Sequence, residues 1–156
     1  NGDEIKSKEF IEKTLNIENT EHWTLSPIGR SFIIKGNLKE AEKIFNLDIK
    51  HNSNLSEPYI NMGNLYYKAM NICRGDNFSR SDKAVASLAY NYFVQAEKKG
   101  NSKYFKQKRW LEENDVLFGR ADWFMLDKDI QTTGRVSPAG RCYEWVSESL
   151  TKQSDW

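Results

Sequence analysis

The chain of 156 residues has few of the residues on which catalysis or covalent cross-linking usually depends: two cysteines, two histidines and three prolines. Its formal net charge is only +1, which argues against a dedicated nucleic-acid binder. No stretch approaches the roughly 20 consecutive apolar residues that a membrane-spanning helix needs. The sequence therefore predicts one domain without a membrane span, large enough to bury a hydrophobic core.

The beginning of the chain also lacks a recognisable targeting segment. No basic stretch followed by an apolar one is present there, so no signal peptide is visible. Because the sequence does not begin with Met, an upstream segment can be missing. Localisation stays open at this point, with the cytoplasm slightly favoured.

The scarce cysteines and histidines do not combine into a chemical site. Cys73 and Cys142 show no metal-ligand spacing with each other or with His22 and His51, so neither a metal site nor a cofactor is predicted. A disulfide between the cysteines stays open, but two reduced thiols are favoured because a domain of this size does not need a cross-link. Cys142, next to Arg141, is a candidate for an activated thiol. No base accompanies it, so the sequence predicts no enzyme.

What the chain does contain is a pattern that recurs after 34 residues. Gly29 and Phe32 are matched by Gly63 and Tyr66, at an offset of 34 in both pairs. Small residues at such positions let two helices approach closely, and the rings fill the space between them. A fixed offset of this length is typical of helical-hairpin repeats.

Apolar residues at helical spacing predict the elements around this pattern. The first hairpin combines a helix over residues 21–36, with Trp23, Ile28, Phe32 and Ile33 on one face, and a helix over 38–51. Pro27 favours a later start of the first of these, near Ser26. The other predicted segments are helices over 3–16, from Glu57 to about 70, around 89–96 and over 103–118, a long loop over 71–82, and a helix beginning at Ser137–Pro138 that carries Ala139, Tyr143, Val146 and Leu150.

Residues 22–55 resemble a tetratricopeptide repeat, a 34-residue unit of two helices. The matching positions are Gly29, Phe32, Gly36, Ala41 and Phe45. Residues 56–102 resemble a second repeat, through Tyr59, Met62, Gly63 and Tyr66 and then, after an insertion at about 71–82, through Ala89, Phe93 and Ala96. The resemblance implies an all-α single domain over 1–156: a short right-handed solenoid of helical hairpins, with capping helices at 3–16 and 103–118. Residues 119–156 are interpreted as an irregular C-terminal extension.

In this family the first helices of successive hairpins line a concave groove that binds peptides, so the resemblance implies that the partner is a protein or peptide. Arg30 is expected to pair with an acidic group, and Asn61 and Asn64 with a peptide backbone. The positions that carry over to this chain are Trp23, Arg30, Ile33, Ile60, Asn61, Asn64, Tyr67 and Lys68.

An alternative hypothesis assigns the function to the C-terminal extension. The protein would then be toxin-neutralising or inhibitor-like, with the aromatic pairs Trp123–Phe124 and Tyr143–Trp145 as anchors on its binding surface. The Asp and Glu residues scattered along the chain are interpreted as solvated helix faces. The polar stretch from Thr151 to Trp156 is expected to be frayed.

Overall fold

A computed structural model describes Glu9, Lys13 and residues 21–100 and 105–156. Within them the chain is mainly helical. The helices are α2 (His22–Ile34), α3 (Leu38–His51), α4 (Glu57–Cys73), α5 (Arg80–Lys98), α6 (Lys106–Glu113), α7 (Arg120–Phe124) and α8 (Lys128–Thr133), followed by strand β1 (Arg135–Val136), the 3₁₀ turn η1 (Arg141–Tyr143) and strand β2 (Leu150–Thr151). Apart from Glu9 and Lys13, the capping helix predicted over 3–16 lies outside the described residues.

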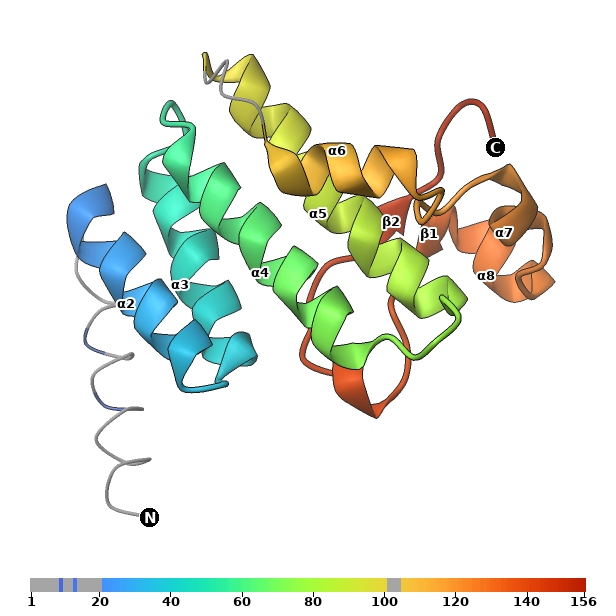
Figure 1. Cartoon of the computed structure of the whole chain (residues 1–156), viewed down its shortest axis with the longest axis horizontal. Helices are drawn as coiled ribbons and strands as arrows, with labels where there is room; N and C mark the ends of the chain where they lie inside the picture. The colour runs from blue at the N-terminus through green and yellow to red at the C-terminus, as the bar shows by residue number, and fades with distance from the viewer. Residues whose placement is uncertain (1–8, 10–12, 14–20, 101–104) are drawn as a thin grey trace.

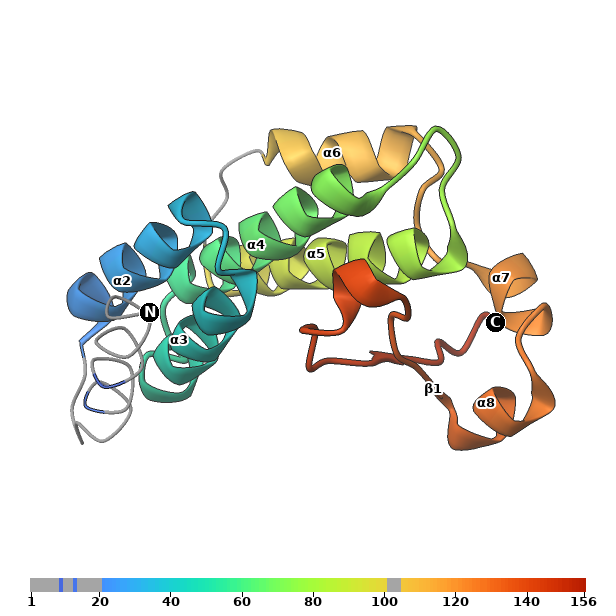
Figure 2. The ribbon, with the colours of Figure 1, turned by 90° about the horizontal axis from the view of Figure 1, so that it is seen from below.

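The first four of these helices form two successive hairpins, α2–α3 and α4–α5, which lie side by side (Figure 1). Helix α3 packs on α4, so the two hairpins share one core, and α6 packs on α5. Seen from below, α6 and the C-terminal segment lie on opposite sides of the α4–α5 hairpin (Figure 2). Two strands, β1 and β2, pair antiparallel within the C-terminal segment, which was predicted to be irregular.

Local sequence signals account for the helix boundaries of both hairpins. Helix α3 spans the predicted residues, and α4 begins at Glu57 with Pro58 in its first turn, where a missing N–H is tolerated. Helix α5 begins with a capping box between Ser79 and Asp82. Helix α2 begins at His22 rather than near Ser26, so Pro27 lies inside it.

In each hairpin, a glycine on the first helix lies directly against a phenylalanine ring of the second helix. A Cβ placed on Gly29 would overlap the ring of Phe45, with Cδ1 and Cζ both 2.7 Å away, and one on Gly63 would lie 2.8 Å from Cε1 of Phe93. Both glycines are buried, and both rings are at most 1% exposed. The two glycines that are 34 residues apart therefore occupy equivalent places in their hairpins.

The second hairpin is longer mainly because its helices are longer, which corrects the predicted long loop over 71–82. Helix α4 continues ten residues beyond Gly63, whereas α2 continues five beyond Gly29. Helix α5 begins 13 residues before Phe93, whereas α3 begins seven before Phe45. The connecting segment grows only from three residues to six. Most of the inserted length is therefore helical.

The buried face of α2 agrees with the prediction at Phe32, with Ile28 and Ile33 partly buried against the core, but not at Trp23. Leu25, Ser26, Gly29 and Phe32 are buried, whereas the side chain of Trp23 is 70% exposed. The inner faces of α3, α4 and α5 follow the prediction, with Ala41, Ile44, Phe45, Met62, Leu65, Tyr66, Ala69, Ala89, Phe93 and Ala96 all buried.

Of two helices predicted in the C-terminal half, one is shorter than predicted and the other is absent. The helix over 103–118 is interrupted, because the chain leaves α6 at Asn114 and Asp115 adopts a left-handed backbone at φ 51°. The helix predicted from Ser137 is replaced by η1 and β2, since Gly140, at φ 97°, breaks a helical path. Tyr143 and Leu150 are nevertheless buried, at 3% and 2% exposure, so their apolar spacing reflects burial without a helix.

Candidate binding groove between helices α2 and α4

A cavity of about 590 Å³ lies between α2 and α4, and it collects most of the binding residues predicted from the sequence. Five of the eight predicted positions line it: Trp23, Arg30, Ile60, Asn61 and Asn64. The remaining lining residues are His22, Ser26, Pro27 and Glu57. Equivalent positions on the first helices of two hairpins thus face one common space.

A hydrogen bond between the two helices forms part of the groove. Nδ2 of Asn61 donates to Oγ of Ser26 at 2.9 Å. Ser26 is buried and Asn61 is half-buried. Asn61 therefore has a positioning contact inside the protein, in addition to its place on the cavity wall.

His22 is tied to the second helix of its hairpin at one end of the groove. Its Nδ1 lies 2.7 Å from Oδ2 of Asp48, and Oδ1 of Asp48 accepts from Nδ2 of Asn52 at 2.9 Å. Asp48 is fully buried, and this burial raises the pKa of its carboxyl group, an effect that the bonds from His22 and Asn52 oppose. The interpretation of the acidic residues as solvated faces was wrong for Asp48.

The exposed side chains of the groove include one aromatic ring, one cation and one carboxylate. Trp23 is 70% exposed, so most of its indole surface is available to a ligand. Arg30 on α2 and Glu57 on α4 are also exposed. A ligand in this space would meet an apolar surface, one cation and one carboxylate.

Three predicted positions lie elsewhere. Ile33 is half-buried and packs on the core, and Lys68 is exposed away from the cavity lining. The Tyr67 ring packs edge-on against Trp110 of α6, with centroids 6.0 Å apart. Helix α6 therefore occupies the part of α4 that sequence reasoning assigned to a ligand.

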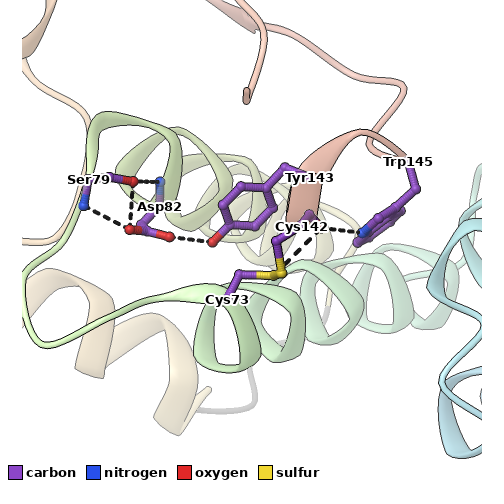
Figure 3. The surroundings of a disulfide bond; sticks show 6 residues. All are labelled: Cys73, Ser79, Asp82, Cys142, Tyr143 and Trp145. Atoms are coloured by element: carbon purple, nitrogen blue, oxygen red, sulfur yellow. Dashed lines mark hydrogen bonds between the residues drawn. A yellow bond between two sulfur atoms is a disulfide. The ribbon is translucent and has the colours of Figure 1, made fainter. Parts of the chain in front are cut away.

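The C-terminal segment is covalently attached to the long hairpin. Cys73, the last residue of α4, forms a disulfide with Cys142 in η1, so the favoured assignment of two reduced thiols was wrong (Figure 3). Because Cys142 is cross-linked, it is not the free thiol of the enzyme hypothesis. The hydroxyl of Tyr143 donates to Oδ1 of Asp82 at 2.5 Å (Figure 3). The Ala139 amide donates to Oγ of Ser81 at 3.0 Å.

The disulfide and these two hydrogen bonds all involve inserted residues of the long hairpin. Cys73 lies in the final turn of α4, and Ser81 and Asp82 lie in the first turn of α5. The extra helical turns of the second hairpin thus provide the surface on which the C-terminal segment is anchored. This gives the insertion at 71–82 a structural role that its composition did not reveal.

Three of the four proposed aromatic anchors of the C-terminal segment face the protein's own core. Trp123 and Tyr143 are each 3% exposed, and Trp145 stacks on Tyr66 at a centroid distance of 6.2 Å. Phe124 alone of the four is well exposed, at 60%. The alternative hypothesis therefore retains one of its anchors.

The end of the chain is packed rather than frayed. The ring of Trp156 lies 5.2 Å from that of Phe118 and 6.0 Å from that of Trp123, measured between centroids. Phe118 and Trp123 are buried, so Trp156 covers an apolar cluster. This is where an expectation based on local polarity failed, because the stabilising contacts are distant in sequence.

Comparisons with known proteins found no matching family model and no significantly similar curated protein or solved structure. Within residues 21–100 and 105–156, no three or more His, Cys, Asp or Glu side chains gather as a metal site would require. None of the helices in that part of the chain combines the length and apolar character needed to cross a bilayer.

Proposed function

We propose that this protein is an interaction module of tetratricopeptide-like helical hairpins that binds an extended peptide in the groove between α2 and α4. One observation carries the proposal: five of the eight positions that the tetratricopeptide resemblance implies line a single cavity. The equivalent contacts of Gly29 with Phe45 and of Gly63 with Phe93 support the repeat interpretation. The solenoid in this proposal is short, with two full hairpins followed by α6.

The groove suits a peptide that combines an apolar and an acidic side chain. Trp23 and Ile60 would contact the apolar group, and Arg30 would pair with a carboxylate. Asn64 would bond the peptide backbone, since an amide both donates and accepts hydrogen bonds. Glu57 lies on the opposite helix and would disfavour a second acidic residue beside it.

The experiment selects binding peptides from a random library on the immobilised, oxidised protein and measures their affinities by calorimetry. Trp23→Ala and Arg30→Ala are the test variants, because both side chains are exposed and their truncation leaves the core intact. Each should weaken binding by about fivefold or more, as expected for residues worth above about 1 kcal/mol.

Lys50→Ala is the matched control, since Lys50 is an exposed cation near the end of α3, outside the cavity lining. The Lys50→Ala variant should bind the selected peptides with the same affinity as the unchanged protein. Peptides that bind both test variants as tightly as the control would place the binding surface elsewhere and refute the groove.

The double variant Asn61→Ala/Asn64→Ala tests the polar wall of the groove. Peptide binding should be lost while the helical circular dichroism signal is unchanged. Because Asn61 also bonds Ser26, Asn64→Ala alone separates a ligand contact from a positioning effect. Retained binding by the double variant would count against these amides as ligand contacts.

A second candidate function keeps the C-terminal extension as an inhibitor-like surface. The supporting observation is that Phe124 is 60% exposed and Met125 72% exposed, and that Met125 lines a second cavity, of about 580 Å³. Deleting residues 120–156 would remove Trp123, Tyr143 and Leu150 from the core, so point variants are the better test. Phe124→Ser/Met125→Ser should abolish the interaction in this case and leave groove-binding peptides unaffected.

The disulfide bears on where such a module would act. Structural disulfides persist in oxidising compartments and are rare in a reducing cytoplasm. The Cys73–Cys142 bond therefore favours an oxidising compartment over the cytoplasm that the sequence slightly favoured. Trapping free thiols at the moment of cell lysis, followed by mass spectrometry, tests this assignment: two trapped thiols would contradict it.

A further inference from the structure

A buried polar cluster joins the C-terminal segment to three helices. The Tyr66 hydroxyl of α4 lies 2.7 Å from Oε1 of Glu42 on α3 and 2.9 Å from Oε1 of Glu148. The Tyr92 hydroxyl of α5 lies 2.5 Å from the same Glu148 oxygen, and the Ser147 amide donates to Oε1 of Glu42 at 2.9 Å. Two carboxyl groups therefore meet at one phenol.

The hydrogen atoms available to this cluster require one carboxyl group to be protonated. The Tyr66 hydroxyl has a single hydrogen, so it can donate a well-aligned hydrogen bond to Glu42 or to Glu148 but not to both. Both oxygen–oxygen distances are hydrogen-bond distances. The second bond consequently needs a proton that belongs to a carboxyl group, as in other pairs of acids that share one proton.

Glu42 is the better holder of that proton. It is 2% exposed, and this burial raises the pKa of its carboxyl group, with the nearby Glu148 adding to the effect. The hydrogen bonds from Tyr66 and Ser147 act in the opposite direction. Glu148 is half-buried and lies within hydrogen-bond distance of the hydroxyls of both Tyr66 and Tyr92, so the geometry makes it the acceptor of the pair.

No cation neutralises the pair within the described parts of the chain, since the ion pairs found there involve neither Glu42 nor Glu148. The titratable groups that face the pair are the phenols of Tyr66 and Tyr92, and both have a raised pKa because they are buried next to these carboxyls. Tyr59 packs against Tyr92, and Nζ of Lys99 lies 5.7 Å from the centroid of the Tyr59 ring.

We propose that Glu42 and Glu148 share one proton through Tyr66, and that this proton fastens the C-terminal segment to the helices as a pH-dependent latch. When Glu42 loses the proton, its carboxylate takes the Tyr66 hydrogen for itself. Glu148 then faces a phenol lone pair and a second negative charge. It leaves the cluster, and residues 144–149 detach while the Cys73–Cys142 bond keeps the segment tethered.

The direction of the pH dependence follows from the raised pKa of Glu42. A carboxyl group that holds its proton more tightly in the folded state contributes most below its ordinary value of 4.5, and this contribution is lost as pH rises through the folded-state value. The latch is therefore closed in acidic solution and opens as pH rises. Because opening is linked to the loss of one proton, the equilibrium constant for opening of the latch increases by up to about tenfold per pH unit.

The experiment follows the side-chain carboxyl carbons of the oxidised protein by NMR between pH 3 and 9. Glu42 should titrate above its ordinary value of 4.5, and over the same pH range the Ser147 amide, which donates to Glu42, should lose hydrogen-exchange protection. The Phe118 amide, which donates to the Ser87 hydroxyl at 2.8 Å, is the internal control and should stay protected. Two carboxyl groups that both titrate near 4.5 would overturn the proposal.

Two variants separate proton sharing from a general loss of stability. Glu42→Gln supplies a permanent N–H in place of the shared proton, so the segment should stay protected up to pH 9. Glu148→Gln removes the second carboxylate, so Glu42 should titrate lower than in the unchanged protein. If Glu42→Gln loses protection with pH as the unchanged protein does, the latch is refuted; if that variant does not fold, the Glu42 titration in Glu148→Gln decides alone.

Discussion

Gly29→Ala tests whether the hairpins are held by close helix approach. The added methyl group would meet the Phe45 ring, with two ring carbons 2.7 Å away and Cε1 closer still, whereas at Gly63 the nearest carbon of Phe93 is 2.8 Å away and the next two are at 3.0 and 3.1 Å. Overpacking costs about 1–3 kcal/mol, and we assign the upper end to Gly29 and the lower end to Gly63. Alanine recovers about 1 kcal/mol of helix propensity at either site.

Gly29→Ala should therefore lower the free energy of unfolding by about 2 kcal/mol, while Gly63→Ala should be close to neutral. Urea unfolding under oxidising conditions, followed by circular dichroism, measures both. Gly75→Ala is the control, because a Cβ at Gly75 has no neighbour within 4 Å.

A second substitution shows whether the cost comes from the ring itself. In a Phe45→Leu background the space next to Gly29 is larger, so the cost of Gly29→Ala should fall by about 1 kcal/mol, as expected for residues in contact. A Gly29→Ala variant as stable as the unchanged protein would refute the close contact between Gly29 and the Phe45 ring. If Gly29→Ala lowers the free energy of unfolding equally in both backgrounds, the destabilisation comes from the backbone and not from contact with the ring.

Three further predictions concern the C-terminal half. Replacing Cys73 and Cys142 together by Ser should cost about 4 kcal/mol of unfolding free energy, because the bond closes a separation of 69 residues, and an unchanged urea midpoint would count against this cross-link. Tyr143→Phe removes the hydroxyl that donates to buried Asp82 and should cost about 2 kcal/mol in the same assay, whereas a neutral result would mean that water replaces the bond. Trp156→Ala should cost roughly 2 kcal/mol, less than a fully buried tryptophan, and a thermal unfolding midpoint that does not change would restore the frayed end.

The parts predicted well depend on contacts that are local in sequence. The bounds of α3, the start of α4 and the buried faces of α3–α5 follow from helical periodicity and from Pro58. The groove positions come from the resemblance to tetratricopeptide repeats, and five of them line one cavity. Tyr67 was misplaced because periodicity shows which side of a helix is apolar but not which neighbouring helix covers it, here α6 through Trp110.

The disulfide and the buried acids could not be predicted in this way. Cys73 and Cys142 are 69 residues apart, and nothing in their local sequence brings them together. Glu42 and Asp48 lie on a helix rich in charged residues, where solvent exposure is the ordinary expectation. Each is buried because a residue distant in sequence forms a hydrogen bond with it: Ser147 of the C-terminal segment bonds Glu42, and His22 bonds Asp48.

The sequence by itself determined the two helices of the first hairpin, the start of α4, and where glycine must stand for two helices to touch, because helical periodicity and side-chain size act over a few residues. Only the tertiary structure decided that the extra turns around Cys73 and Asp82 hold the C-terminal segment, and that Glu42 and Glu148 meet at one phenol. Those contacts join segments up to 106 residues apart, from Glu42 to Glu148, and such pairings are set by how whole elements pack rather than by any local pattern.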